Sequence, residues 1–95
     1  MSSLHILNSA NSDPWQHCQA LCQCDDAIVF YADGVALALQ EDKLKTLNEN
    51  GVRCYALQVD CEARGVQLNR TLVELIDYDA WVTLSTQYKN SPNWS

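Results

Sequence analysis

Three of the five cysteines of this chain lie within a stretch of ten residues, HCQALCQCDD, which runs from His17 to Asp26. A cysteine thiolate can ligate a metal ion, attack another sulfur atom or carry a persulfide, whereas an uncharged cysteine packs in a core as a small apolar side chain. The cluster is therefore a candidate metal site, a candidate site for sulfur or redox chemistry, or part of the buried face of a helix.

The spacing of these thiols argues against a metal site. Zinc prefers four ligands, commonly in pairs separated by two to four residues, and Cys18 and Cys22 form one such pair without a second. Around a helix, His17 lies about 100° away from Cys18, and Cys24 would have to turn back from the helix end. We therefore expect no metal ion.

Helical spacing alone accounts for much of the cluster. Trp15, Cys18, Leu21 and Cys22 recur at the period of one helix face. Free cysteine is among the most buried residue types, so packing of this face against a sheet explains the pattern. Cys54 lies within an apolar run and has the same interpretation.

Cys18 differs from the other thiols in its expected electrostatic surroundings. It follows Pro14, a residue suited to the first turn of a helix, by about one turn, and it is next to His17. A helix N-terminus and a cation both favour the thiolate. Cys24 lies at the opposite end of the same helix and precedes two aspartates, which disfavour a further negative charge. If one thiol is a nucleophile or a persulfide carrier, the sequence favours Cys18.

Other candidate chemistry is sparse. His5 lies in a short apolar run and is expected to be a hydrogen-bonded residue of the sheet. The three glycines stand at turns and form no phosphate-binding loop, so we expect no cofactor. Asp33-Gly34 follows a strand, where an open α/β sheet can place a crevice, but this dipeptide is also common in tight turns.

Apolar runs that alternate with helical patterns predict parallel strands joined by helices. Asp13 and Asp77 are the expected helix N-caps. The predicted strands span residues 4–8, 27–32, 53–59 and 71–76, with a last short edge strand around Trp94, and the predicted helices span residues 14–24, 35–40, 42–49, 60–64 and 78–88.

Length and composition place limits on function. The 95 residues are enough for one domain, residues 1–95, and their 47% hydrophobic and 19% charged content is that of a globular protein. The net charge of -6 disfavours direct nucleic-acid binding. No apolar run approaches the about 20 residues of a membrane span, and no basic segment precedes an apolar leader. We expect a cytoplasmic protein with reduced thiols and no membrane contact.

Several motifs in fixed order resemble the TusB/DsrH family of sulfur-relay proteins. They are LHILN at the N-terminus, DGVALAL after the second strand, CYALQVDCEARG across the third, LIDYDAWVTLSTQY near the end, and a tryptophan close to the C-terminus. The resemblance covers nearly the whole chain. It implies a three-layer α/β/α fold with a mainly parallel sheet of four or five strands, DsrEFH-like with flavodoxin-like wrapping.

The resemblance also implies partners. TusB and DsrH are subunits of a heterohexamer with TusC- and TusD-like, or DsrF- and DsrE-like, proteins. In the Tus branch, the complex takes persulfide sulfur from a TusA-like carrier and passes it on through a TusE-like carrier for 2-thiolation of the tRNA wobble uridine. In the Dsr branch, the complex serves sulfur oxidation. The principal sulfur-carrying cysteine belongs to the TusD- or DsrE-like subunit.

Some features of the chain depart from the family pattern. DsrH-type members carry a cysteine in the first helix, which aligns with Cys18, with Cys22 as the alternative, whereas typical TusB members lack it. Ala32 stands where an acidic residue usually precedes DGV, and Cys61 replaces an aliphatic residue. The first departure concerns the chemistry of that loop, and the second adds a thiol without an assigned role.

Three functional hypotheses follow. The chain is a structural subunit of the relay, a relay subunit whose own Cys18 carries sulfur, or a free-standing module that binds a small ligand or performs redox chemistry. We favour the first hypothesis and expect the complex to serve tRNA thiolation. We expect a non-catalytic relay subunit more than a sulfurtransferase in its own right. The large aromatic residues support assembly, because aromatic side chains are enriched at interfaces, and the candidates for contact are Trp15, Trp81 and Trp94.

Overall fold

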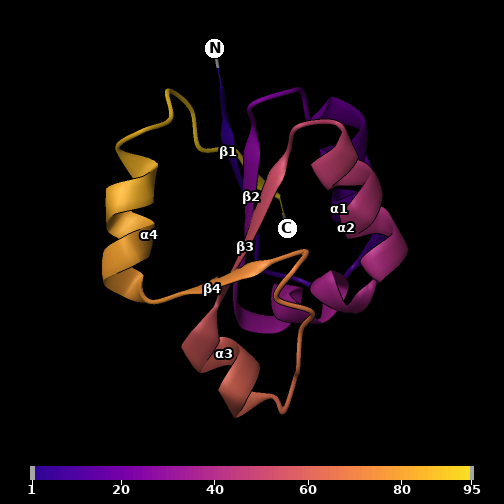
Figure 1. Cartoon of the computed structure of the whole chain (residues 1–95), viewed down its shortest axis with the longest axis vertical. Coiled ribbons are helices and arrows are strands. Elements are labelled where there is room, and N and C mark those ends of the chain that lie inside the picture. Colours follow the sequence, from indigo (N-terminus) through magenta and orange to yellow (C-terminus); the bar gives the residue numbers. More distant parts are fainter. Residues whose placement is uncertain (1, 95) are drawn as a thin grey trace.

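Five parallel strands form one sheet in the computed structural model, which describes residues 2–94. Their order across the sheet is β4-β3-β2-β1-β5, and Figure 1 shows the strands between helices. The strands are β1 (Leu4–Leu7), β2 (Ala27–Phe30), β3 (Arg53–Leu57), β4 (Glu74–Ile76) and β5 (Asn93–Trp94). The helices are α1 (Ser12–Leu21), the 3-10 helix η1 (Ala32–Leu39), α2 (Glu41–Glu49), α3 (Gln58–Ala63) and α4 (Tyr78–Ser85).

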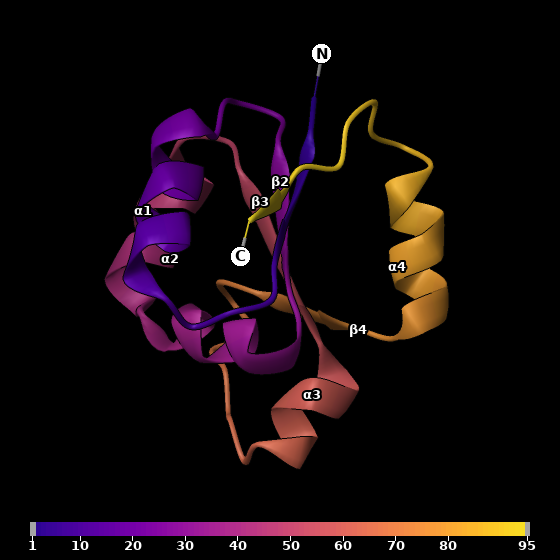
Figure 2. The same cartoon turned by 180° about the vertical axis from the view of Figure 1, so that it is seen from behind.

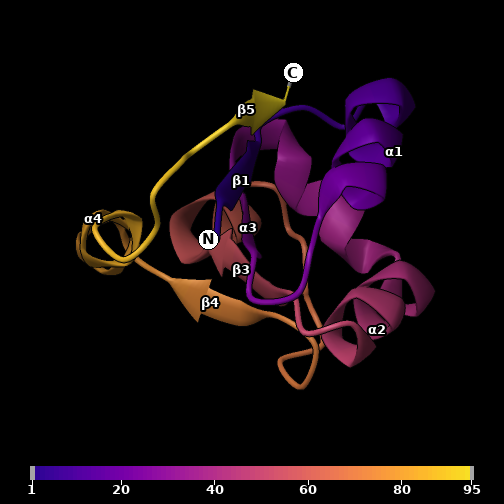
Figure 3. The same ribbon diagram turned by 90° about the horizontal axis from the view of Figure 1, so that it is seen from above.

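Helices cover both faces of the sheet. On one face, Ile28 and Phe30 of β2 pack in the larger core together with α1, η1 and α2. On the other face, Ala27 and Val29 pack with the apolar side of α4. This alternation leaves every residue of β2 buried, as expected of a central parallel strand. Figures 2 and 3 show α4 on the side opposite to α1 and α2, which confirms the three-layer α/β/α fold.

The limits of the first helix differ from the prediction. Asn11, with extended backbone angles, is the N-cap in place of Asp13, and the helix ends at Leu21 rather than near Cys24. Pro14 is therefore the third helical residue, which is tolerated because the first turn of a helix has no intrahelical partners for its N–H groups. Cys22 becomes the C-cap, and its N–H donates to the carbonyl of Cys18.

The other elements follow the predicted order with changed lengths. The segment from residue 35 to 40 is part of the 3-10 helix η1, and only the last three residues of the predicted strand 71–76 belong to β4. The N-cap at Asp77 is confirmed, because its carboxylate accepts a hydrogen bond of 2.8 Å from the N–H of Ala80. The edge strand at Trp94 is also confirmed, and it pairs with β1.

The apolar face predicted for α1 is only partly buried. Trp15 is buried and packs edge-on against Phe30, so it is a core residue and not a contact for a partner. Leu21 is 58% exposed, in contrast to its predicted packing. The next residue, Cys22, packs against the larger core in its place. Among residues 2–94, no helix has the length and apolar character that a membrane span requires.

Gly34 of η1 lies directly against the backbone of the sheet. A Cβ atom at this position would overlap the backbone carbonyl of Leu7 at the end of β1. That carbonyl already accepts a hydrogen bond from the N–H of Tyr31. The glycine of the DGV motif is therefore required by backbone packing.

We predict that Gly34→Ala lowers the free energy of unfolding by about 3 kcal/mol, because backbone must move to admit the methyl group. Gly65→Ala is the matched control. Gly65 has a positive φ of 64° but no atom within 4 Å of an added Cβ, so only backbone strain of about 1 kcal/mol is expected. Urea unfolding curves of both variants measure the difference, and equal losses would contradict the close approach.

Candidate functional site

The five cysteines are free thiols in distinct environments. Cys18 lies in α1 and is fully buried, and Cys22, at the C-cap of the same helix, is half-buried. Cys24 is exposed, whereas Cys54 in β3 and Cys61 in α3 are buried. Within HCQALCQCDD, Cys18 is therefore in the core, Cys22 lies between core and solvent, and Cys24 is on the surface.

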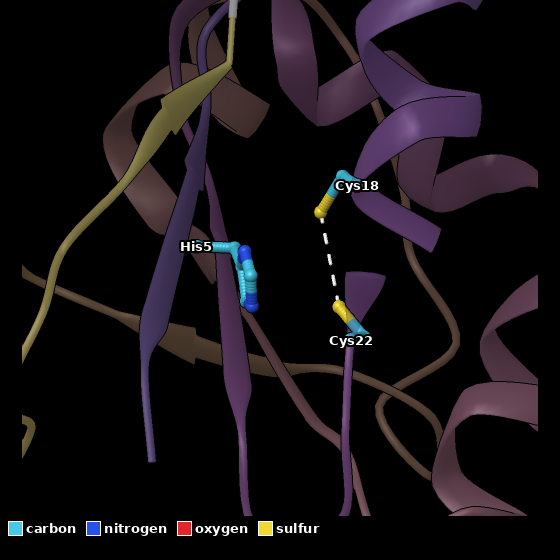
Figure 4. Close-up of side chains that lie close together, drawn as sticks. All are labelled: His5, Cys18 and Cys22. Carbon is cyan, nitrogen blue, oxygen red and sulfur yellow. Dashed lines mark hydrogen bonds between the residues drawn. The ribbon is translucent and has the colours of Figure 1, made fainter. Parts of the chain in front are cut away.

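Cys18 and Cys22 contact each other. They are one helical turn apart, and their Sγ atoms are 3.8 Å from one another in a weak hydrogen bond (Figure 4). Because Cys22 follows the last residue of α1, its side chain approaches the helix from the loop side.

His5 completes this cluster from the first strand. One nitrogen of its ring and the two Sγ atoms all lie within 4.8 Å of one another, and Figure 4 shows the ring beside the cysteine pair. Among residues 2–94, these three side chains are the group that could hold a metal ion. His17, the histidine next to Cys18 in sequence, is exposed and outside the cluster.

Hydrogen bonds fix the orientation of the His5 ring. The indole N–H of Trp94 donates to Nδ1 over 3.0 Å, so Nδ1 acts as an acceptor. The proton of the neutral ring then lies on Nε2, which is 2.9 Å from Oδ2 of Asp26. The prediction of a hydrogen-bonded sheet histidine is confirmed.

Asp26 is buried and holds three hydrogen-bond donors. Oδ1 accepts from the N–H of Ser3 at 2.8 Å, and Oδ2 accepts from the N–H of Gln23 at 3.0 Å in addition to His5. Burial raises the pKa of this carboxyl, but the hydrogen bonds from His5, Ser3 and Gln23 outweigh burial and hold the pKa below its usual value. The carboxylate is therefore charged at neutral pH.

The pKa values of the two thiols are shifted in opposite directions. The hydrogen bond from Cys18 lowers the pKa of Cys22 to about 6, with burial opposing the shift and His5 supporting it. The same hydrogen bond raises the pKa of Cys18 far above its ordinary value, and burial adds to this effect. The pair thus shares one proton, and these opposite shifts favour the thiolate on Cys22 over a thiolate on Cys18.

The charge of the imidazole responds to the same neighbours. Burial would lower the pKa of His5, but hydrogen bonding to Cys22 and Asp26 outweighs burial and raises it. A thiolate on Cys22 and a carboxylate on Asp26 thus stabilise a positive charge on the ring between them. A second proton on the ring would occupy Nδ1, where Trp94 now donates, so protonation of His5 competes with the hydrogen bond from Trp94.

These environments bear on the choice between Cys18 and Cys22. Cys18 is the seventh of ten residues of α1, well away from the helix N-terminus, and its side chain is 0% exposed. The favourable field expected at Cys18 from the helix dipole is therefore weak, and burial disfavours its thiolate. Cys22, the alternative, has both solvent access and a histidine beside it. Cys22 is thus the more accessible thiol of the pair, and sequence reasoning missed His5 as its neighbour.

The alternation of side chains along the first strand is the signal that could have found His5. Leu4 faces the core under α4, whereas Leu7 faces the core under α1. Residues at odd positions of this strand therefore point toward the helix that follows it. His5 shares the face of Leu7, the face on which Cys18 and Cys22 pack.

The loop at Asp33-Gly34 is held by hydrogen bonds and ion pairs to α3. Ala32 has a positive φ of 51°, and its N–H donates to Oδ2 of Asp60 at 2.7 Å. The guanidinium of Arg64 contacts Asp33 at 3.0 Å and Asp60 at 3.7 Å. The carboxylates of this loop are thus engaged with the backbone and with an arginine.

The chain is thus a small α/β protein with a parallel sheet between helices. Its candidate site is an ionisable thiol beside a histidine that is hydrogen-bonded to a carboxylate. A family profile described as DsrH like protein matches residues 8–91. Protein TusB of Salmonella arizonae and Protein TusB of Salmonella typhimurium are each 32% identical over 95 residues, covering 96% of this chain and 99% of theirs. The chain belongs to the TusB/DsrH family.

A solved structure agrees with this assignment at the level of fold. The solution NMR structure of protein Tm0979 from Thermotoga maritima superposes with a TM-score of 0.65 at 24% identity, covering 92% of this chain and 93% of that chain. Membership of the TusB/DsrH family supports a role as a sulfur-relay subunit.

We predict that Cys22 is alkylated by iodoacetamide with a rate that rises through pH 6 and levels off above it. The sign follows from its lowered pKa, because the reactive thiolate is already formed at neutral pH. Cys18→Ala should move the midpoint upward more than His5→Gln does, since the hydrogen bond from Cys18 is the larger cause. Peptide mass spectrometry of pulse-labelled protein, with metals chelated, measures each rate.

Two controls accompany this measurement. Cys24→Ser removes the exposed thiol of the same segment from the background, and Cys18→Ser retains a hydroxyl donor toward Cys22 where alanine does not. A midpoint for Cys22 near that of an ordinary thiol, or faster labelling of Cys18 than of Cys22, would contradict the assigned environments.

Proposed function

We propose that the chain is a subunit of a cytoplasmic sulfur-relay complex of the TusBCD or DsrEFH type, serving 2-thiolation of the tRNA wobble uridine. Its partners are TusC/DsrF-like and TusD/DsrE-like subunits in a heterohexamer, with TusA- and TusE-like carriers acting on the complex. The observation that carries this proposal is the family match along nearly the whole chain. The principal active cysteine belongs to the TusD/DsrE-like subunit.

The surface of α4 supports a role in assembly. Tyr78 and Val82 of this helix are 59% and 65% exposed, and Tyr78 stacks on the partly buried Trp81. None of the residues of α4 is fully buried, although Trp81 and Leu84 pack against the sheet. An outer helix with exposed aromatic and aliphatic side chains is suited to a protein partner.

A second candidate function is that the chain itself carries sulfur, as DsrH-type members do in sulfur oxidation. The thiol cluster favours this role, with Cys18 as the carrier aligned with the family and Cys22 as the carrier favoured by access. The thiolate of Cys22 would attack the outer sulfur of a donor persulfide, so that a new S–S bond forms on Cys22 and the donor leaves as a thiolate. Sulfane sulfur is transferred without any external oxidant.

Loading with a persulfide donor distinguishes the two roles. When the assembled complex is incubated with a persulfidated TusA-like carrier, a structural role predicts the mass gain of one sulfur atom on the TusD/DsrE-like subunit alone. A carrier role predicts the same gain on this chain, at the peptide that contains Cys22. Intact-mass and peptide mass spectrometry measure both, and Cys22→Ser should abolish loading of this chain while Cys24→Ser should not.

Deletion of the gene tests the pathway. We expect loss of wobble 2-thiouridine from cellular tRNA, restored by the wild-type gene and measured by nucleoside mass spectrometry. If the role is structural, a Cys18→Ala, Cys22→Ser double variant restores the modification as well, because assembly does not need the thiols. Unchanged 2-thiouridine after deletion would contradict a role in tRNA thiolation.

A further inference from the structure

We propose that His5, Cys18 and Cys22 form a binding site for a thiophilic divalent ion, with zinc as the ion it fits. The site joins one ligand from β1 to two from the end of α1, within the larger core of the molecule. This inference goes beyond the sulfur relay, because it concerns the chain alone in the absence of a sulfur donor.

The separation of the two sulfur atoms matches zinc coordination. Two thiolates at Zn–S distances of about 2.3 Å in a tetrahedral site lie about 3.8 Å from each other. The Sγ atoms of Cys18 and Cys22 are 3.8 Å apart. The nitrogen of His5 is within 4.8 Å of both, so it must close by at most about 1.3 Å to reach a common ion.

The surroundings of the three ligands suit a cation. The two thiolates neutralise a divalent ion, and the buried carboxylate of Asp26 lies against the ring of His5. A metal-ligating histidine usually donates the N–H of its other ring nitrogen to a carboxylate, and Asp26 at Nε2 supplies this partner when Nδ1 is the ligand. Cys18 and His5 are buried, which keeps water from the inner side, whereas the half-buried Cys22 provides the route of entry. Three protein ligands leave the fourth position to water or a thiol.

Occupation of the site requires a change at Trp94. Zinc needs the lone pair of one ring nitrogen of His5, and Nδ1 now accepts from Trp94 while Nε2 faces Asp26. If Nδ1 is the ligand, the indole N–H must leave it. If Nε2 is the ligand, its proton moves to Nδ1, and the indole can no longer donate there. In both cases the hydrogen bond from Trp94 is lost, and the thiol protons pass to solvent.

The test uses the full chain, reduced and free of metal, without any sulfur donor. Titration with Co²⁺ is expected to give one bound ion per chain, with thiolate-to-cobalt charge transfer and tetrahedral d–d absorption, and Zn²⁺ should displace it. The tryptophan fluorescence should change on binding, and this change should be absent in Trp94→Phe. X-ray absorption of the zinc-loaded wild-type chain should show two sulfur neighbours and at least one imidazole.

Variants identify the ligands. Cys18→Ser, Cys22→Ser and His5→Gln should each weaken zinc binding at least tenfold, while Cys24→Ser, the matched thiol of the same segment, should leave it unchanged. Circular dichroism verifies that each variant is folded, and the X-ray absorption of the wild-type chain needs no variant. Absence of stoichiometric binding, binding that survives His5→Gln at full strength, or loss of binding with Cys24→Ser would overturn the proposal.

Failure of the metal site and failure of the sulfur relay are separable. Metal binding is measured on the isolated chain, whereas the relay is measured as wobble 2-thiouridine and sulfur loading in the complex. If the isolated chain binds zinc but deletion of its gene leaves tRNA thiolation unchanged, the metal site is supported and the proposed function is contradicted. The converse result would retain only the proposed function.

Discussion

The hydrogen bonds of one buried carboxylate organise the candidate site. Asp26 lies directly before β2 and is 4% exposed, so its charge requires compensation within the fold. Its partners are the N–H of Ser3 directly before β1, the N–H of Gln23 after α1, and the ring of His5. Loss of this carboxylate would leave two backbone N–H donors and the Nε2–H of His5 without this acceptor. The same group thus joins the first strand to the end of the first helix.

The sequence predicts the layered fold well because the physical signals for it are local. The apolar run at residues 27–30, the cap at Asp77 and the alternation of strand and helix patterns each depend on neighbours within a few positions. The predicted N-terminus of α1 was wrong, because Asp13 and Asn11 are both acceptable N-caps and Pro14 is compatible with either start. The predicted strand at residues 71–76 was too long, because only its last three residues pair with β3.

The candidate site could be predicted only in part, since its contacts span long separations in sequence. His5 and Asp26 are 21 positions apart, and Trp94 and His5 are 89 apart. Sequence reasoning weighed Cys18 by the helix dipole, whose effect of about 0.3–1 kcal/mol is confined to the first turn. Full burial of Cys18 outweighs an effect of this size. The ranking of the two thiols therefore depends on depth in the core, which spacing does not reveal.

The motifs that carry the family resemblance serve another part of the molecule than the thiols. Asp60 and Arg64 of the D-x-x-A-R-G segment bind Ala32 and Asp33 beyond the carboxyl end of β2, while Asp26 and the thiols lie at the amino end of this strand. Gly34 is required there by contact with the backbone of β1. These contacts maintain the fold whether or not the first helix contains cysteine. The architecture of this chain thus rests on contacts at one end of the sheet, and its thiol cluster lies at the other end.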